Sequence, residues 1–443
     1  MSSTFPERGG AAGPTPEQLI RMQAHAKVAP GEIAVGVIVG RMSEYFDFFV
    51  FGISCVLVFP SVVFPFASLL DGILYAFTVF SLAFIARPFG TALFMSFQRR
   101  WSRGTKLTIA LFLLGTATAG MAFLPSYQVA GTWSIGLLVL FRILQGIAFG
   151  GSWDGLPSLL ALNTPPQRRG WYAMLGQLSA PIGFIVAAAL FLFLHSSLNQ
   201  EDFIDWGWRY PFFVALAINV VALFARLRLV VTEEYTVAME ERELEPIGII
   251  ELLRTQGYNI FIGAFASLAS YALFHLVTIF PLSWIVLGST ETVSDVLVSE
   301  MIGAVACIVG MIVSGLLADR IGRRTTLGLM AALIGVFALI TPWLLGGGKL
   351  GQNAFIILGF AGLGLSYGQA AGSVTANFEM RLRYAGAALT TDFAWLIGAA
   401  FAPLVALSLS VRFGLVAVSA YLLSGVLCTL VALRVNRALA ARE

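Results

Sequence analysis

The feature of this sequence that most restricts its fold is a succession of long apolar segments joined by short polar stretches. A helix needs roughly 20 apolar residues to cross the hydrocarbon core of a bilayer, because that core is about 30 Å thick. Segments of about this length lie near residues 33–59, 72–97, 106–124, 133–160, 171–194, 209–230, 258–286, 298–318, 325–345, 352–376, 385–410 and 413–434. The sequence therefore predicts an all-α membrane protein with twelve transmembrane helices.

The amino-acid composition agrees with a membrane protein and excludes an ordinary soluble domain. Of the 443 residues, 58% are hydrophobic and 12% are charged, whereas about a quarter of the residues in soluble domains are charged. The 45 glycines suit membrane helices, whose backbones approach closely where small residues meet. The cysteines Cys55, Cys307 and Cys428 all fall in apolar segments, so we expect neither a disulfide framework nor a metal site.

The placement of basic residues predicts the orientation of the chain. Basic clusters lie at Arg21–Lys27, Arg99–Lys106, Arg168–Arg169, Arg320–Arg324, Arg381–Arg383 and Arg434–Arg442. Loops 59–72 and 125–134 contain no Lys or Arg. Because cytoplasmic loops are enriched in these residues, the tails 1–32 and 435–443 are both predicted to be cytoplasmic. We expect a plasma membrane location, in a bacterial inner membrane, with the lipid bilayer as partner and no nucleic acid.

The longest hydrophilic stretch divides the apolar segments into two groups of six. Residues 231–257 contain seven glutamates and are predicted to form a partly helical cytoplasmic linker between the halves 33–230 and 258–434. The loops after the second and eighth segments, residues 90–106 and 315–325, resemble each other. Duplicated halves around a site at the membrane midplane are a common plan of secondary transporters.

One loop carries a motif that is complete. Residues 315–324 read Gly-Leu-Leu-Ala-Asp-Arg-Ile-Gly-Arg-Arg, which resembles the loop motif of the major facilitator superfamily. The resemblance implies two pseudo-symmetric six-helix halves, with Asp319 and Arg323 tying neighbouring helix ends together as a cytoplasmic gate. In the loop after the second segment, Arg99 occupies the position of the aspartate. An Asp–Arg latch cannot form there, which leaves the chemistry of the N-terminal gate open.

Further motifs are similar to those of the metabolite:proton symporter family within that superfamily. They are Glu44-Tyr-Phe-Asp-Phe-Phe in the first segment, Arg87-Pro-Phe-Gly in the second, Arg142-Ile-Leu-Gln-Gly in the fourth and Trp206-Gly-Trp-Arg-Tyr-Pro at the sixth. The fourth segment departs from the family pattern, because Ser152 replaces a glutamate and Asp154 follows two residues later. The resemblance implies proton-coupled transport of carboxylates or of zwitterions such as betaine and proline.

Two carboxylates in the first segment are candidates for proton or substrate binding. Glu44 and Asp47 are three residues apart and therefore share one helix face. Ionisable groups inside a membrane are costly, so they usually face a cavity or a charged partner. A carboxyl group in a low-dielectric cavity favours its neutral form, which allows it to load a proton on one side and release it on the other. The alternative is a static ion pair with Arg87 or Arg142.

The fourth segment contributes Arg142 and Gln145, which also lie three residues apart. An arginine can hold a carboxylate through two parallel hydrogen bonds. Arg142 is therefore expected to bind an anionic substrate or to neutralise Asp47 or Asp154. Asp154 follows Arg142 by 12 residues, or about 18 Å along a helix, so the two cannot pair within one helix.

The candidates in the C-terminal half are Asp392, Trp395, Tyr271 and His275. Asp392 and Trp395 are three residues apart, and Tyr271 and His275 are four apart, so each pair shares a helix face. His275 could titrate near neutral pH or serve as a hydrogen-bonded packing residue. Glu300 lies near a predicted membrane boundary and is expected to cap the eighth helix.

The glycine-rich stretches favour helix packing over catalysis. Gly364-Leu-Ser-Tyr-Gly matches the serine-hydrolase pattern, but that motif needs a strand-to-helix turn, and here it lies inside an apolar segment. Gly346-Gly-Gly-Lys lacks the spacing of a phosphate-binding loop. We expect no enzymatic activity and no cofactor; the proton gradient is the predicted energy source.

The predicted function is secondary active transport, with proton-coupled uptake of a small polar metabolite, an organic carboxylate or a zwitterion, by alternating access. The acids inside the apolar segments are Glu44, Asp47, Asp154 and Asp392. They outnumber the two arginines, Arg87 and Arg142, which argues against a highly charged anion such as citrate. The alternatives are a proton-coupled exporter of drugs or metabolites and a transporter-like membrane sensor. The protein is expected to be monomeric.

Overall fold

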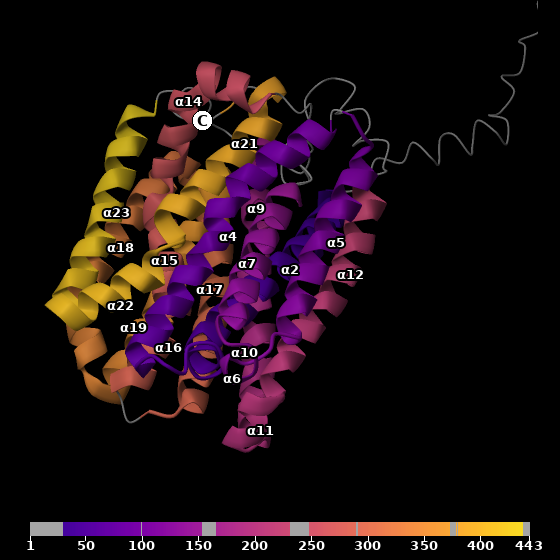
Figure 1. Ribbon diagram of the computed structural model, residues 1–443. Coiled ribbons are helices and arrows are strands. Elements are labelled where there is room, and N and C mark those ends of the chain that lie inside the picture. The colour runs from indigo at the N-terminus through magenta and orange to yellow at the C-terminus, as the bar shows by residue number, and fades with distance from the viewer. Residues whose placement is uncertain are drawn as a thin grey trace, which may run out of the picture.

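The computed structural model describes residues 30–98, 100–152, 165–230, 248–288, 291–372, 378 and 380–436. Most of both predicted tails lie outside these ranges, as do Arg99, Asp154 and residues 231–247 of the predicted linker. Within the described ranges the chain is a bundle of long helices that run roughly parallel to one direction (Figure 1).

The N-terminal half forms one group of helices in this bundle. Its main helices are α2 (Pro30–Leu57), α4 (Leu69–Gln98), α5 (Arg103–Ala122), α7 (Thr132–Gly151), α9 (Arg169–Leu175), α10 (Ser179–Ser197) and α12 (Tyr210–Val230). Short helices lie in the connections: α3 (Phe59–Val62), α6 (Tyr127–Ala130) and α11 (Gln200–Asp205). α9 and α10 together make up the fifth predicted segment.

The C-terminal half forms the second group. Its helices are α14 (Ile249–Ala266), α15 (Leu268–Thr278), α16 (Phe280–Gly288), α17 (Val293–Ile321), α18 (Arg323–Gly346), α19 (Gly348–Tyr367), α21 (Met380–Ala394), α22 (Ala402–Phe413) and α23 (Leu415–Val435). α14 begins inside the segment 231–257 that was predicted as a linker.

All twelve predicted segments correspond to helices of the described chain. Eleven stretches are long and apolar enough to cross a membrane. α2 is the further long helix, and it differs because Arg41, Glu44 and Asp47 lie close together in its sequence. The prediction of a twelve-helix fold is therefore confirmed, and α2, with three charged residues in the middle of the helix, is the first place to look for a polar site.

Besides the fifth segment, which is divided between α9 and α10, two predicted segments are interrupted. Segment 258–286 is divided among α14, α15 and α16; the second break precedes Pro281, whose ring removes a backbone N–H and disfavours a continuous helix. Segment 385–410 is divided by a π-helical turn at Trp395–Ala399, between α21 and α22. Such turns are frequent at functional sites, and this one carries a predicted site residue, Trp395.

Glycines bring corresponding helices of each half into backbone contact. A Cβ atom added to Gly146 would lie 2.3 Å from the Ala83 carbonyl oxygen, so α7 and α4 can pack this closely only with glycine there. Gly364 does the same for α19 and α17, because an added Cβ would lie 2.1 Å from the Cys307 carbonyl oxygen. The packing role expected for Gly364 is confirmed, and the two contacts reflect the pseudo-symmetry of the halves.

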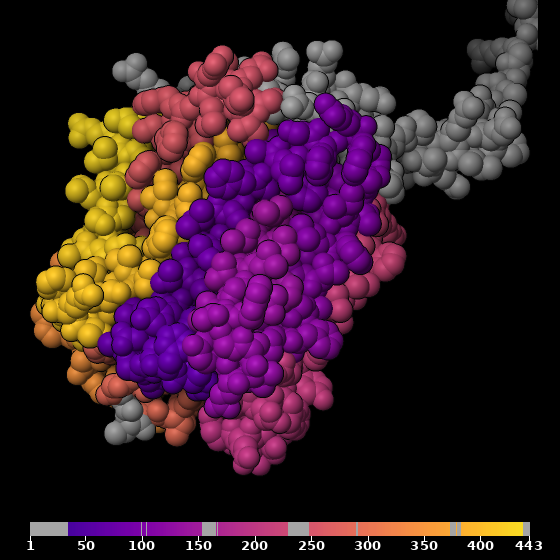
Figure 2. Space-filling model, viewed as in Figure 1, coloured from indigo at the N-terminus to yellow at the C-terminus, as the bar shows by residue number. Residues whose placement is uncertain are grey.

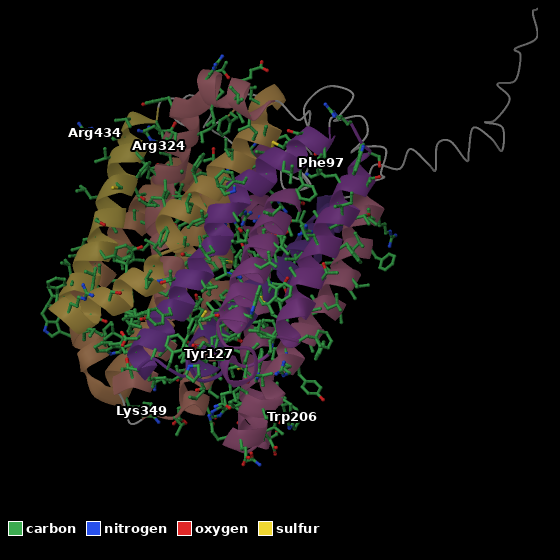
Figure 3. All side chains as sticks on the ribbon, viewed as in Figure 1. Phe97, Tyr127, Trp206, Arg324, Lys349 and Arg434 are labelled. Atoms are coloured by element: carbon green, nitrogen blue, oxygen red, sulfur yellow. The ribbon has the colours of Figure 1, made fainter. Side chains whose placement is uncertain are left out.

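The two ends of the bundle differ in charge. Arg324 and Arg434 lie at one end, which we call the basic end, and Lys349 and Trp206 lie at the other (Figure 3). The basic end is the one predicted to be cytoplasmic. The halves meet along a seam on which α4 lies against α21 and α22 (Figure 2), and α10 packs against α17.

Candidate transport site

Glu44 belongs to a buried ion pair within the N-terminal half. Arg226 of α12 donates a hydrogen bond from Nη2 to Glu44 Oε1 at 2.6 Å, and the Ser152 hydroxyl donates to the same oxygen at 2.8 Å. Glu44 is 7% exposed and Arg226 is 1% exposed. The structure therefore shows a static ion pair, although with Arg226 rather than with the partners that the sequence offered. An arginine inside the sixth apolar segment was the signal that sequence reasoning overlooked.

Asp47 lies at the end of a chain of hydrogen bonds. Its Oδ2 accepts from Asn219 Nδ2 at 2.9 Å and from Thr118 Oγ1 at 3.3 Å. Gln145 Nε2 donates to Thr118 at 2.7 Å, and Arg142 Nη1 donates to Gln145 Oε1 at 2.9 Å. Asp47 Oδ1 is buried and has no hydrogen-bond partner in the part of the chain that the structure describes. Asp47 thus faces neutral donors directly and reaches a positive charge only through two intervening side chains.

Arg142 is enclosed by backbone and aromatic groups. Its Nε and Nη2 donate to the Phe80 carbonyl oxygen at 3.2 and 3.1 Å. The guanidinium carbon lies 4.0 Å from the ring centroid of Phe51 and 4.8 Å from that of Phe80. Within the described part of the chain Arg142 forms no ion pair, so its charge is available to offset a negative charge on Asp47 or on a ligand.

A second buried ion pair joins the two halves. Arg87 Nε of α4 donates to Asp392 Oδ1 of α21 at 2.6 Å, and Thr91 Oγ1 donates to Asp392 Oδ2 at 2.5 Å. Arg87 is 4% exposed and Asp392 is 2% exposed. Breaking a buried pair leaves an uncompensated charge and is strongly unfavourable. The pair therefore favours the closed arrangement of α4 against α21.

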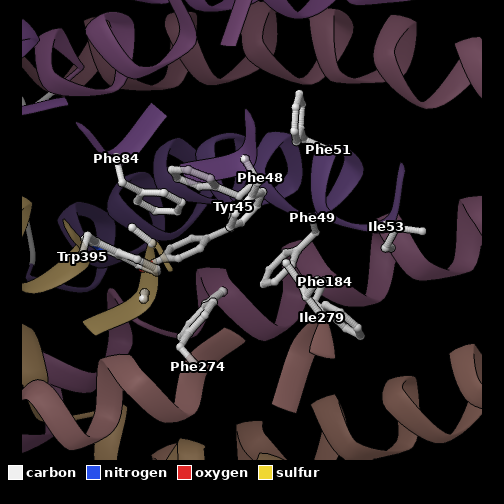
Figure 4. Close-up of a cluster of buried hydrophobic side chains, with 14 of the residues drawn as sticks. Tyr45, Phe48, Phe49, Phe51, Ile53, Phe84, Phe184, Phe274, Ile279 and Trp395 are labelled. Atoms are coloured by element: carbon white, nitrogen blue, oxygen red, sulfur yellow. The ribbon is translucent and has the colours of Figure 1, made fainter. Parts of the chain in front are cut away.

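An aromatic cluster fills the space between the halves at Trp395 (Figure 4). The Trp395 ring lies 5.0 Å from Phe274, 5.1 Å from Tyr271, 5.7 Å from Phe84 and 6.2 Å from Tyr45 between ring centroids. Two of these rings come from the N-terminal half and two from the C-terminal half. The cluster closes the centre of the bundle, and its flat faces could stack on a ligand when the halves separate.

Two ring nitrogens in this cluster lack partners. His275 lies 5.8 Å from Trp395 between centroids, and its Nδ1 is 3.4 Å from Thr278 Oγ1. His275 Nε2 and Trp395 Nε1 are both buried without a hydrogen-bond partner among the described residues. Buried polar atoms are usually satisfied, so these two mark a place where a bound molecule could supply the missing bonds.

The complete loop motif contributes a contact between the halves at the basic end. Asp319 Oδ1, at the end of α17, accepts from the backbone N–H of Gly170 at 2.7 Å and of Trp171 at 3.3 Å, at the start of α9. A helix N-terminus favours a negative charge in this position. Arg323 Nη1 donates to the Gly372 carbonyl oxygen at 3.1 Å. We call the Asp319 contact with α9 the C-terminal latch.

The altered loop motif contributes a different contact at the same end. The Tyr384 hydroxyl of α21 donates to Gln98 Oε1 at 2.8 Å and accepts from Lys106 Nζ at 3.2 Å. Gln98 ends α4, and Lys106 lies in the first turns of α5. We call this contact the N-terminal latch. Neither Lys106 nor Tyr384 was predicted as a gate residue.

The expectation for Glu300 was wrong. α17 begins at Val293, and the Thr292 side chain caps it by accepting from Asp295 N at 3.1 Å. Glu300 therefore lies two turns inside the helix, where it is fully buried and both carboxyl oxygens lack partners among the described residues. Because an isolated buried charge is costly, we describe this side chain as a neutral acid. Asp154 lies outside the described residues.

Comparison with known proteins identifies the family. A model of the Major Facilitator Superfamily matches residues 48–403. The chain belongs to this superfamily. The resemblance seen in the loop and helix motifs is thereby confirmed, and the protein is a multi-pass membrane transporter rather than an enzyme.

Relatives and solved structures agree with this assignment. The chain is 33% identical over 408 residues to the inner membrane metabolite transport protein YhjE of Escherichia coli (strain K12), covering 91% of this chain and 93% of the relative. It is 29% identical over 324 residues to a citrate-proton symporter of Klebsiella pneumoniae, covering 73% and 71%. A crystal structure of a D-xylose-proton symporter superposes with a TM-score of 0.70 at 17% identity, covering 92% and 97%, which supports the fold.

Proposed function

We propose that this chain is a secondary active transporter that takes up an organic carboxylate or a zwitterion together with protons. The observation that carries the proposal is the environment of Asp47, a buried carboxyl group that is linked to Arg142 only through Thr118 and Gln145. The names of the relatives, a metabolite transport protein and a citrate-proton symporter, support this class of substrate and this coupling.

The proton step follows from the burial of Asp47. The side chain is 1% exposed, and a charged carboxylate without a close counter-ion is costly in such a position. With a proton on Asp47, the carboxyl group can stay buried among its partners in the N-terminal half at no such cost. The proton can leave in the state in which water reaches the carboxyl group, because Arg142 then offsets the negative charge.

The contacts between the two halves imply that the halves move against each other. These contacts cannot all persist when a path for the substrate opens to one side of the membrane. At the basic end, the C-terminal latch and the N-terminal latch join the halves. Nearer the centre, the Arg87–Asp392 pair joins them. Towards the other end, Ile279 lies against the backbone of Gly52, where an added Cβ would meet it at 2.4 Å. Opening either end requires one set of contacts to break while the other holds, which is alternating access.

The remaining features of the proposal concern the cell. We propose a monomer in a bacterial inner membrane, with both termini cytoplasmic and no cofactor. The basic end then faces the cytoplasm, and the two latches are its inner gate. Uptake requires the inner gate to open after protons and substrate have bound from outside.

Transport in liposomes tests the proposal. The purified full-length protein is reconstituted, an inside-alkaline pH gradient is imposed, and uptake of labelled shikimate, glycine betaine and 2-oxoglutarate is measured beside protein-free liposomes. We expect at least one probe to accumulate and a protonophore to abolish the accumulation. Accumulation that persists after the gradient is dissipated would contradict proton coupling, and a protein that moves none of the probes in either direction would contradict the proposed substrate class.

A further inference from the structure

Arg41 is an arginine inside the bundle that forms no ion pair among the described residues, although Glu44, three residues along α2, is near enough to interact with it electrostatically. It lies on α2 one turn before Tyr45, and its guanidinium carbon is 5.9 Å from the centroid of the Tyr45 ring. It is partly buried, and this contact with the ring is its one close side-chain interaction among the described residues. Its charge therefore lies near tyrosine side chains and near the Glu44 carboxylate, which Arg226 already binds.

The other buried arginines are already engaged. Arg87 pairs with Asp392, and Arg226 pairs with Glu44. Arg142 donates to a backbone carbonyl and to Gln145. These contacts also correct the charge balance estimated from the sequence, because Arg41 and Arg226 add two bases to the interior. Arg41 differs from the other three because none of its guanidinium nitrogens has a hydrogen-bond partner among the described residues.

Tyrosines from both halves lie near Arg41. The hydroxyls of Tyr45 and Tyr367 are 2.7 Å apart, and the Tyr45 hydroxyl lies 3.5 Å from Gln177 Oε1. Tyr367 and Tyr271 of the C-terminal half are both near enough to the guanidinium to interact with it electrostatically. Arg41 thus lies at the seam between the halves, on the basic side of the Trp395 cluster, with hydrogen-bonding groups on several sides.

We infer that the Arg41 guanidinium binds a carboxylate group of the transported substrate. A guanidinium presents donors that fit a carboxylate bidentately, and the buried, unpartnered Trp395 Nε1 supplies a further donor next to the same tyrosines. Arg142 also forms no ion pair among the described residues, but its guanidinium already donates to Phe80 and Gln145, so Arg41 offers a site for one carboxylate, which favours a substrate with a single carboxylate. This inference rests on the proposed transport function and adds the chemical group that the site recognises.

Two kinds of molecule carry a single carboxylate, and the aromatic cluster at Trp395 could bind the rest of either one. A hydroxylated ring acid such as shikimate would stack its ring on the aromatic faces. Glycine betaine would place its quaternary ammonium group against the same faces, since aromatic rings attract such cations. In both cases Arg41 binds the carboxylate. The tyrosine hydroxyls bind the other polar groups of the substrate, where it has any.

Calorimetric titration of the purified full-length protein tests the inference without requiring transport. The probes are shikimate, its methyl ester, glycine betaine and citrate, and the variants are Arg41→Gln and Arg41→Lys. Arg412→Gln is the matched control, because Arg412 is exposed near the end of α22. We expect shikimate or betaine to bind the wild type, and the shikimate ester to bind at least about tenfold more weakly than the acid.

The variants give the decisive comparison. Arg41→Gln should weaken binding of the carboxylate probe at least about tenfold, Arg41→Lys should weaken it less, and Arg412→Gln should leave it unchanged. Unaltered binding of the methyl ester to Arg41→Gln would show that the site is still folded. Arg41→Gln binding the acid as tightly as the wild type, the ester binding as tightly as the acid, or no carboxylate binding at all would overturn the inference.

The same titration separates this inference from the proposed proton coupling. Asp47→Asn should still bind the carboxylate probe, because Arg41 is unchanged. If Arg41→Gln keeps full affinity while the wild type accumulates substrate in a pH gradient, only the role of Arg41 is wrong. If Arg41→Gln loses affinity while the wild type ignores the gradient, only the coupling is wrong.

Discussion

The two latches at the basic end join the same halves by different chemistry. In the C-terminal latch, a carboxylate at the end of α17 accepts two backbone N–H groups of α9. In the N-terminal latch, the hydroxyl of Tyr384 connects the Gln98 amide and the Lys106 ammonium group. Each latch runs from the loop motif of one half to a helix of the other, so the positions correspond while the residues do not.

This difference shows that the gate at the basic end depends more on which helix ends meet there than on the residues of the loop motif. Arg99 occupies the place of the motif aspartate, and the sequence alone left no partner for that gate. The structure provides one, because Tyr384 brings a hydroxyl group from α21 to the end of α4. Hydrogen bonds with an ionised donor or acceptor are roughly twice as strong as neutral ones. Both bonds of the C-terminal latch are of this kind, whereas in the N-terminal latch only the 3.2 Å bond from Lys106 is, so the C-terminal latch should contribute more to closing the basic end.

The largest expected effect comes from Asp319→Ala. The change removes the charge that accepts both backbone groups of α9, and such bonds contribute about 1.5–3 kcal/mol. The equilibrium should shift toward opening at the basic end by about tenfold or more. Spin labels at Ser96 and Val435, both exposed, should report a larger population of long distances by double electron–electron resonance. An unchanged distance distribution would contradict the role of the C-terminal latch in closing the basic end.

A smaller effect is expected from Tyr384→Phe, which deletes one hydroxyl and leaves the ring. Its neutral hydrogen bond to Gln98 contributes about 1 kcal/mol and the bond from Lys106 is long at 3.2 Å, so the same equilibrium should shift about fivefold. The same spin-label pair measures it. The ranking of the two latches fails if Tyr384→Phe opens the basic end as far as Asp319→Ala does.

The smallest effect is expected in the interaction between the two changes. The latches share no residues, so in the double variant their free energies should add to within about 0.5 kcal/mol. The measurement is the open population of the two single variants and the double variant. A coupling well above that value would mean that the two contacts form one network and cannot be compared as separate latches.

The fold could be predicted from the sequence because a membrane imposes a simple length rule. A spanning helix satisfies its own backbone and needs about 20 apolar residues, so twelve apolar segments predict twelve helices. The interruptions at Ile279 and at Trp395–Ala399 were not predicted, because each depends on how one turn packs against neighbouring helices.

The partners of the site residues could not be read from the sequence in the same way. Glu44 pairs with Arg226, 182 positions along the chain, and that choice depends on which helices adjoin and how each is rotated. Glu300 was expected at a helix end because the boundary of the apolar segment was placed after the true start of α17. Shared helix faces were predictable from spacing, as for Arg142 and Gln145, which hydrogen-bond each other.

Asp47→Asn in liposomes tests the central claim most directly. The substitution keeps a side chain of the same shape that cannot carry a proton through a transport cycle. Using a carboxylate that the wild type accumulates, we expect pH-gradient-driven accumulation to be lost, while exchange of external label for internal substrate continues at a rate near that of the wild type. Accumulation by Asp47→Asn equal to that of the wild type would contradict the account, since the proton would then travel without Asp47.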